Sequence, residues 1–305
     1  MTNSLHPSWA ELNFKAPGNE GIHSLISGDG DNPWMTLGIM DNIEDEDLLV
    51  EWDALLDVQT RLLASREIDW MRSKGLGAEG AGILEIGSAN GNYGSRLASD
   101  FPESTLFGVE ANPHLAARLD AATCPDNYSI TVCKVGEEPL PGYVQSEFRQ
   151  CVLRFVSQHV SDPLKLLRAV YESLPAGGSL YIIEEDDALF NSYPPSSNFE
   201  TAFDIWRRVT AAGGSNSKIG RELPSLVERA GFTIASFEIA LRNNIEAGCQ
   251  FNEFFASATK LFLRTNPSMV SEEDLKTVLE GLSDFRSTRG VIATYPQFLL
   301  HARKE

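Results

Sequence analysis

Cysteine is scarce in this sequence of 305 residues. The four cysteines, Cys124, Cys133, Cys151 and Cys249, form no CxxC pair and show no regular spacing. A disulfide framework or a cysteine-based metal site is therefore not expected. We interpret the four residues as reduced thiols in a cytoplasmic protein.

Positive charge and long apolar runs are also lacking. The chain has 43 acidic residues against 25 basic ones, and its formal net charge is −18. A negative surface repels phosphate backbones and anionic lipids, so neither nucleic acid nor a membrane is the expected main partner. No apolar stretch approaches the roughly 18 residues of a membrane span, and the first residues do not resemble a signal peptide.

The first 77 residues show no alternation of strand and helix patterns. Residues 1–40 are rich in Gly, Asn, Ser and Pro, which indicates a flexible tail or an arm that folds over the active site. Residues 41–77 predict a helical segment, because apolar residues recur at three- and four-residue steps from Leu48 to Leu63. The eight acids between Asp41 and Asp57 suit the positive end of a helix dipole, so we interpret them as a solvated face rather than a metal site.

From residue 78 onward, strand and helix patterns alternate. This alternation predicts an α/β fold, Rossmann-like, with a seven-stranded, mostly parallel sheet and helices on both faces. The expected organisation is a cofactor-binding core over 78–240, which contains a substrate-covering segment over 188–220, and a helical insertion with a closing strand over 241–305. The predicted strands are 82–86, 105–109, 128–135, 148–153, 179–183, 232–240 and 297–302.

One segment carries the main chemical signal: the sequence ILEIGSANG, which ends at Gly91, follows the first predicted strand and opens a helix. Glycines there let the backbone approach a ligand closely at a helix N-terminus. An acid, Glu110, ends the second predicted strand 19 residues after Gly91, where a ribose-binding carboxylate is expected. A second acid, Glu85, would repel a pyrophosphate but attract a cationic, phosphate-free nucleoside. The two acids favour S-adenosylmethionine over a nicotinamide cofactor.

Five motifs together resemble the class I S-adenosylmethionine-dependent methyltransferases. They are LEIGSANG, FGVEANP, VLRFVSQHVSDP, LPAGGSLYIIEEDD and IGRELPSLVERAGF, in this order. Within this class, the motifs are most similar to those of the small-molecule methyltransferases of ubiquinone and menaquinone biosynthesis. The resemblance covers roughly residues 48–240 and a last strand near 298–302, and it implies S-adenosylmethionine as the cofactor.

The resemblance implies roles for the glycine loop and the two acids. Glu85, Gly87 and Gly91 match the motif whose backbone cups the methionine and ribose parts of the cofactor. Glu110 matches the acid that binds both ribose hydroxyls. The sequence departs from the usual GxGxG at Ala89, so the loop must accommodate a methyl group at its middle position.

The resemblance also assigns residues to the two ends of the cofactor. Ala111 and Asn112 match positions beside the adenine, and Gly136 or Glu137 falls where a residue usually meets the adenine amino group. The acid that is common after the third strand is missing there. Arg154 falls where the methionyl end of the cofactor meets the substrate, or it pairs with an acid of the EEDD run that follows the fifth predicted strand.

The candidates for catalysis and substrate binding each have a simpler structural alternative. His159 is the candidate general base, since the pKa of a free histidine is near 6.5, but it equally fits a histidine bonded to the backbone. Tyr93 either covers the methionine end of the cofactor or packs on its helix. Glu185 and Asp186 are expected at the substrate mouth, although the four acids of this run cannot all face one ligand. Trp206 either lines the substrate pocket or belongs to the core. No metal site is expected.

These observations predict transfer of a methyl group from S-adenosylmethionine to an O, N or C atom of a small organic molecule, in secondary or specialised metabolism. Two alternatives are a nucleic-acid or protein methyltransferase and a non-catalytic S-adenosylmethionine-binding protein, because the motifs report cofactor binding rather than chemistry. The chain is expected to act as a monomer or a homodimer.

Overall fold

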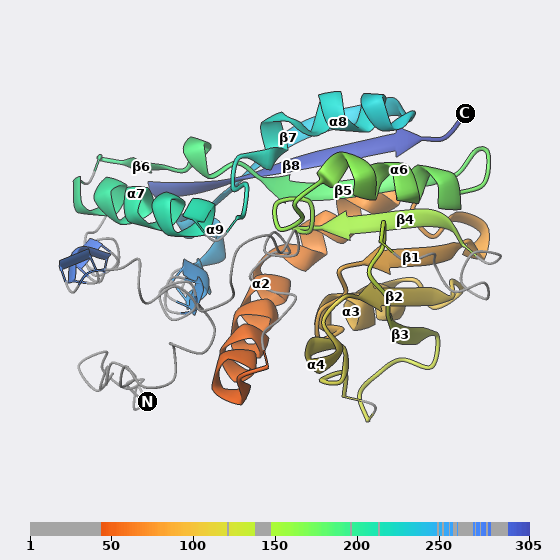
Figure 1. The fold of residues 1–305 in the computed structure, drawn as a ribbon, viewed down its shortest axis with the longest axis horizontal. Helices are drawn as coiled ribbons and strands as arrows, with labels where there is room; N and C mark the ends of the chain where they lie inside the picture. The colour runs from red at the N-terminus through yellow and green to blue at the C-terminus, as the bar shows by residue number, and fades with distance from the viewer. Residues whose placement is uncertain are drawn as a thin grey trace, which may run out of the picture. The chain divides into compact units, whose positions relative to one another are not determined.

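A computed structural model describes residues 44–120, 122–137, 148–195, 197–212, 214–248 and 292–305, together with parts of 250–281. The predicted arm over 1–40 lies outside the described residues. Figure 1 shows the elements along the chain. They are α2 (Glu46–Ser73), η2 (Ala78–Gly80), β1 (Gly82–Ile86), α3 (Asn92–Asp100), β2 (Leu106–Glu110), α4 (Pro113–Ala116), β3 (Tyr128–Val132), β4 (Phe148–Arg154), α6 (Pro163–Ser173), β5 (Ser179–Glu185), η3 (Asp187–Leu189), β6 (Asn191–Tyr193), α7 (Ser197–Ala212), η4 (Ile219–Arg221), α8 (Leu223–Ala230), β7 (Thr233–Asn243), α9 (Asn244–Ala247) and β8 (Ile292–Arg303).

The strands form one mixed sheet in the order β3-β2-β1-β4-β5-β8-β6, and β7 pairs with β8. Strands β1 to β5 pair in parallel, whereas β8 runs antiparallel to β5, β6 and β7. Because parallel strands need crossover connections, helices pack on the sheet between successive strands. The Rossmann-like fold with a mostly parallel sheet is confirmed.

The described part of the chain has eight strands rather than the seven expected, and the additional one is β6. No strand was predicted in this part of the segment over 188–220. Strand β8 begins at Ile292 and extends beyond the last residue pair it makes with β5, Glu185 with Gln297. Its first residues therefore need other hydrogen-bond partners, and Asn191 to Tyr193 provide them on that side.

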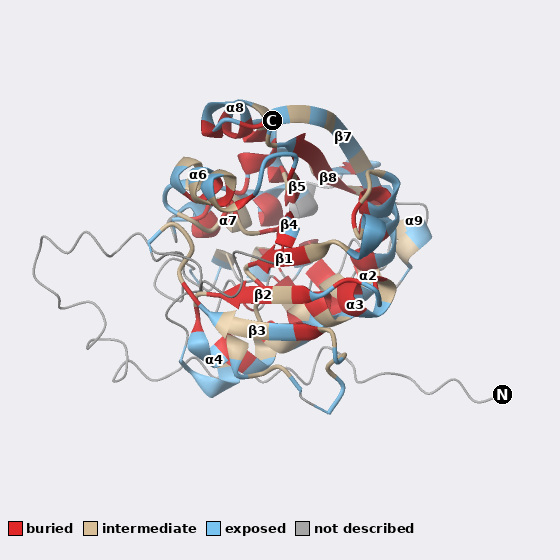
Figure 2. Ribbon diagram, turned by 90° about the vertical axis from the view of Figure 1, so that its right-hand side faces the viewer, coloured by how far each residue is buried: buried red, intermediate tan, exposed pale blue. Residues whose placement is uncertain are grey.

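Helices cover both faces of the sheet. In Figure 2, α6 and α8 lie to the left of the strands, and α2 and α3 lie to the right. Each face has its own buried apolar cluster. The cluster beneath α6 and α8 includes Leu167, Val170 and Val227, and the cluster beneath α2 and α3 includes Leu63 and Leu97. Burial of both faces explains the continuous apolar runs of the central strands.

The local sequence sets where the helices begin and end. The Asp45 carboxylate accepts the Leu48 N–H at 3.0 Å at the start of α2. Asp162 plays the same part for α6, whose first residue is Pro163. Gly231, with φ 108°, ends α8 in a left-handed conformation that suits glycine. None of the helices within the described residues is long and apolar enough to cross a membrane.

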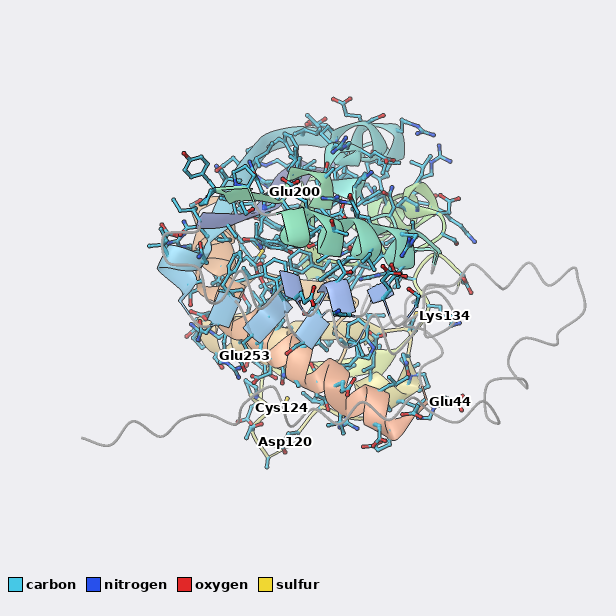
Figure 3. All side chains as sticks on the ribbon, turned by 90° about the vertical axis from the view of Figure 1, so that its left-hand side faces the viewer. Glu44, Asp120, Cys124, Lys134, Glu200 and Glu253 are labelled. Carbon is cyan, nitrogen blue, oxygen red and sulfur yellow. The ribbon has the colours of Figure 1, made fainter. Side chains whose placement is uncertain are left out.

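The parallel strands run toward the left side of Figure 1, as the arrow of β4 shows. Figure 3 views this side of the molecule. Helix α7, which carries the labelled Glu200, lies above the helical residues around Glu253, and α2 lies below them. Three helical segments from distant parts of the sequence thus gather at the carboxyl ends of the strands.

Candidate functional site

A cavity lies at the carboxyl ends of β1, β2, β4 and β5, where open α/β sheets bind their ligands. Its walls come from the loops after these strands and from α2, α7 and the helical residues beyond α9. The lining residues are Trp52, Leu55, Leu56, Gln59, Thr60, Glu85, Ile86, Gly87, Ser88, Ala89, Asn90, Tyr93, Val109, Glu110, Ala111, Leu115, Cys133, Lys134, Val135, Gly136, Glu137, Arg154, Phe155, Val156, Gln158, His159, Val160, Ser161, Asp162, Lys165, Leu166, Glu185, Phe190, Trp206, Phe254, Phe255 and Ala258.

The loop after β1 holds a left-handed backbone at Gly87, Ala89 and Gly91, with φ of 73°, 47° and 79°. Glycine adopts this region without cost, but a Cβ raises the energy of Ala89 by about 1 kcal/mol. The departure from GxGxG thus leaves the loop shape intact at the expense of local strain.

The carboxylate of Glu110 is fixed beside this loop. Its Oε2 accepts the Ala89 N–H at 2.7 Å, and its Oε1 accepts the Asn112 N–H at 2.9 Å. Carboxylate oxygens accept more than one hydrogen bond each. The side chain is therefore oriented in a way that fits two adjacent hydroxyls of a ribose.

The hydrogen bonds of the loop distinguish between cofactor classes. The Gly87 and Ser88 N–H groups both donate to the Val109 carbonyl, at 2.8 and 3.1 Å. These amides are engaged within the protein, and they do not form the free N–H cradle that a pyrophosphate needs. The donor set therefore fits a phosphate-free nucleoside such as S-adenosylmethionine.

Glu85 supplies a second buried carboxylate next to the loop. Its Oε2 accepts the Tyr128 hydroxyl at 2.8 Å. Burial raises the pKa of Glu85 to about 7, although the Tyr128 hydroxyl and the charge of Arg154 oppose this shift. A Cβ at Gly94 would lie 2.3 Å from the Glu85 carboxylate, so glycine is required there for the pair to form.

Arg154 ends β4, the strand next to the one that carries Glu85, and is held by α2. Its Nε donates to Glu67 at 2.7 Å, and its Nη1 donates to the Gln59 side chain at 2.9 Å. The guanidinium also lies 4.2 Å from the centre of the Tyr93 ring. Arg154 thus pairs with an acid of α2 and not with the EEDD run.

The model of a methyltransferase domain family matches residues 59–236, more than half of the chain. The chain belongs to this methyltransferase family. The match confirms the expected class of S-adenosylmethionine-dependent methyltransferases and the expected cofactor.

Two curated relatives and one solved structure illustrate the range of similar proteins. Methyltransferase str3 of Strobilurus tenacellus is 26% identical over 148 residues, which are 48% of this chain and 50% of that protein. The tRNA U34 carboxymethyltransferase of Campylobacter curvus is 26% identical over 107 residues, 35% of either protein. The matches thus span half or less of the length of these relatives. A phosphoethanolamine N-methyltransferase of Haemonchus contortus has a TM-score of 0.53 at 16% identity, covering 87% of this chain and 60% of that one, which shows a shared fold.

Most of the residues expected at the methyltransferase site line the cavity. Gly91, Asn112 and Asp186 do not. Gly91 directly precedes α3, and Asn112 caps α4 by accepting the His114 N–H at 2.8 Å. Asp186 is fully buried and accepts the Arg221 guanidinium at 2.8 Å. The expected residues that do line the cavity are Glu85, Gly87, Ala89, Tyr93, Glu110, Ala111, Gly136, Glu137, Arg154, His159, Glu185 and Trp206.

His159 lines the cavity, but its surroundings make it a weak base. Its Nδ1 lies 3.2 Å from the Ser215 hydroxyl. Burial lowers the pKa of the imidazole to about 4, well below the operating range of a base at neutral pH. Glu185, in contrast, has a pKa raised by burial to about 7.

Sequence reasoning missed the contribution of α2. Trp52, Leu55 and Gln59 of this helix line the cavity, and Glu67 holds Arg154. The apolar spacing predicted the helix, but it could not show that one face of the helix would line the cavity. Sequence reasoning also missed four phenylalanines that come from three separate segments of the chain: Phe155, Phe190, Phe254 and Phe255.

Proposed function

We propose that this protein transfers a methyl group from S-adenosylmethionine to a small organic molecule. The supporting observation is a row of charged side chains that line one cavity at the ends of four neighbouring strands. From β2 to β5 these are Glu110, Glu85, Arg154 and Glu185. Neighbouring strands are about 4.8 Å apart, so the row spans the length that a nucleoside and an acceptor need side by side.

Each part of the row has a separate task in this proposal. Glu110 binds the ribose hydroxyls, and Glu85 places negative charge beside the cationic end of the cofactor. S-adenosylmethionine supplies an activated methyl group, so much of the rate enhancement comes from positioning. Arg154, fixed by Glu67, separates the cofactor end of the cavity from the acceptor end at Glu185.

The acceptor end is enclosed by the expected substrate-covering segment and by residues of the helical insertion. Phe190 and Trp206 come from residues 188–220, and Phe254, Phe255 and Ala258 follow α9. Apolar walls with a few polar groups are typical of small-molecule sites. They support a compact organic acceptor rather than a nucleic acid or a protein side chain. A cytoplasmic location and a monomeric or homodimeric state remain part of the proposal.

Two measurements test this function. Calorimetry should detect binding of S-adenosylhomocysteine, and methyl-labelled S-adenosylmethionine should label small molecules of a metabolite extract. Protein that binds the cofactor without any turnover would indicate a non-catalytic binding protein. Labelling of RNA or protein in the same extract, but not of small molecules, would favour the alternative substrate classes. Absence of binding would contradict the proposal as a whole.

A further inference from the structure

The acceptor end of the cavity contains a carboxylate with one occupied and one available oxygen. Glu185 ends β5, and its Oε2 accepts the hydroxyl of Tyr295 from β8 at 2.5 Å. Within the described residues, no donor to the other oxygen, Oε1, is present. Glu185 lines the cavity, while Tyr295 behind it is buried at 1% exposure. The carboxylate is thus held from behind and offers an acceptor to the cavity.

Aromatic rings pack around Tyr295, the hydrogen-bond partner of this carboxylate. Phe190 lies at the centre, with ring centroids 4.9 Å from Tyr295, 5.4 Å from Phe255 and 4.8 Å from Phe203. Phe254 lies 5.2 Å from Phe255 and 5.7 Å from Tyr295. A wall of packed rings favours a flat, apolar ligand, because aromatic pairs add to the free energy of burial.

The charges next to Glu185 decide between a neutral and a cationic acceptor. Arg154 ends the neighbouring strand and lines the same cavity. The sulfonium of the cofactor adds a second positive charge when it is bound. The charge of Arg154 is compensated by Glu67 at 2.7 Å, so the sulfonium is the charge that discriminates: it repels a cationic amine and stabilises a hydroxyl that develops negative charge.

We propose that this cavity takes a flat apolar molecule with a phenolic or enolic hydroxyl, and that Oε1 of Glu185 accepts the hydroxyl proton. The inference rests on the proposed methyl transfer and names its acceptor class. When the cofactor is bound, the hydroxyl oxygen forms the new bond to the methyl carbon, the carbon–sulfur bond breaks with its electron pair going to sulfur, and the proton moves to Glu185. The proton then leaves to solvent, which restores the carboxylate.

Tyr295 is a positioning residue in this arrangement. Its hydroxyl fixes the carboxylate plane and favours the ionised form of Glu185, as a hydrogen bond to a carboxylate does. Burial acts in the opposite direction and raises the Glu185 pKa to about 7, close to the pH at which a general base works best. Three acids lie near this carboxylate: Asp186 and Asp187, which follow it in the chain and raise its pKa further, and the buried Glu184, which precedes it. Arg154 ends the neighbouring strand β4 and is paired with Glu67.

A binding experiment tests the acceptor class without turnover. Protein saturated with S-adenosylhomocysteine is titrated with phenol, naphthol and hydroxycoumarin, each compared with its methyl ether. We expect at least one hydroxyl compound to bind roughly 10- to 100-fold more tightly than its ether, since a hydrogen bond to a charged group is lost in the ether. In Glu185→Gln this preference should shrink severalfold or more. Glu184→Gln is the matched control, since Glu184 is fully buried, does not line the cavity and accepts the Ser157 N–H.

The results separate this inference from the proposed function. If S-adenosylhomocysteine binds but every hydroxyl compound binds no better than its ether, or none binds, the acceptor class is wrong while the cofactor site stands. Transfer of the labelled methyl group from S-adenosylmethionine to benzylamine or naphthylmethylamine, but to none of the hydroxyl compounds, would overturn it in favour of an amine acceptor. If S-adenosylhomocysteine itself does not bind, the methyltransferase proposal fails first.

A pH profile tests the role of Tyr295. Binding of the preferred hydroxyl compound should strengthen as Glu185 loses its proton near pH 7. In Tyr295→Phe the Glu185 pKa should rise, so that this transition moves to higher pH. A purely structural role of Tyr295 would weaken binding at all pH values without moving the transition, and that result would contradict the assignment.

Discussion

The cavity joins two regions that are built in different ways. The cofactor region comprises the ends of β1 and β2 and the glycine loop, and its key groups lie within 26 residues, from Glu85 to Glu110. The acceptor region gathers β5, β8, α7 and the residues beyond α9, which are separated by up to about a hundred residues. Local backbone geometry shapes the first region, whereas packing between distant side chains shapes the second. A motif can therefore reveal cofactor binding while it says little about the acceptor.

The largest expected effect is a loss of turnover on substitution of Glu185, at the acceptor end of the cavity. Glu185→Gln should lower turnover by about 10²- to 10⁴-fold, the range for loss of a general base, because glutamine cannot accept the proton. Cofactor affinity should stay the same, since Glu185 lies at the acceptor end. Steady-state kinetics and calorimetry with S-adenosylhomocysteine measure the two quantities.

The pH dependence sharpens this prediction. The pKa of Glu185 is raised to about 7, and its ionised form is the base, so wild-type turnover should rise as the pH increases through about 7. The profile of Glu185→Gln should be flat over this range. A rise that persists in the variant would assign the base to another group.

Glu67 connects the two regions through a buried network. Its carboxylate accepts Arg154 at 2.7 Å and Gln297 at 2.5 Å, and Gln297 in turn accepts Arg242 at 2.7 Å. Glu67→Ala leaves Arg154 buried without a carboxylate, which should destabilise the fold by about 3–5 kcal/mol. Urea unfolding measures the loss.

The double variant Glu67→Met, Arg154→Met provides the control for this network. Replacement of both partners removes the unpaired charge, so stability should return close to that of the wild type. If the single and double variants are equally unstable, lost packing rather than the uncompensated charge is responsible.

Glu110 tests the cofactor region alone. Glu110→Ala should weaken binding of S-adenosylhomocysteine by about 1–3 kcal/mol, as expected for loss of charge-assisted hydrogen bonds at a buried site. Glu200→Ala, at an exposed position of α7, should leave this affinity unchanged. Unaltered affinity in a folded Glu110→Ala protein would remove Glu110 from the ribose site.

Substitution of His159 tests whether the general base is this histidine or Glu185. Because burial lowers the pKa of His159 to about 4, His159→Ala should reduce turnover only about tenfold or less, through lost positioning. A loss of about 10²-fold or more, together with unchanged cofactor affinity, would restore the histidine as the general base. Kinetics of this variant next to Glu185→Gln compare the two directly.

The smallest expected effect concerns the strain in the glycine loop. Ala89 has φ 47°, so Ala89→Gly should stabilise the protein by about 0.5–1 kcal/mol. The N–H that donates to Glu110 is retained, and cofactor affinity should therefore hardly change. A thermal midpoint below that of the wild type would show that the methyl group contributes packing that outweighs the strain.

Much of the fold could be predicted because its signals are local. The apolar run at Gly82–Ile86 matches β1, and the local pair Asp162-Pro163 marks the start of α6. Strand β6 was missed because three residues are too few to show a periodic pattern. They form a strand only because the first residues of β8 extend beyond β5 and pair with them. Asn112 and Asp186 were placed at the site by their position, but their side chains serve a helix cap and an ion pair.

The Rossmann-like core, the glycine loop after β1 and the acid at the end of β2 could be predicted from the sequence, because each depends on residues close together in the chain. The folded chain was needed to see that α2 holds Arg154, that Tyr295 holds Glu185, and that burial makes His159 a weak base. These properties arise from contacts between distant segments and from burial, which fix hydrogen-bond partners and pKa values. Neither quantity can be calculated from the spacing of residues along a sequence.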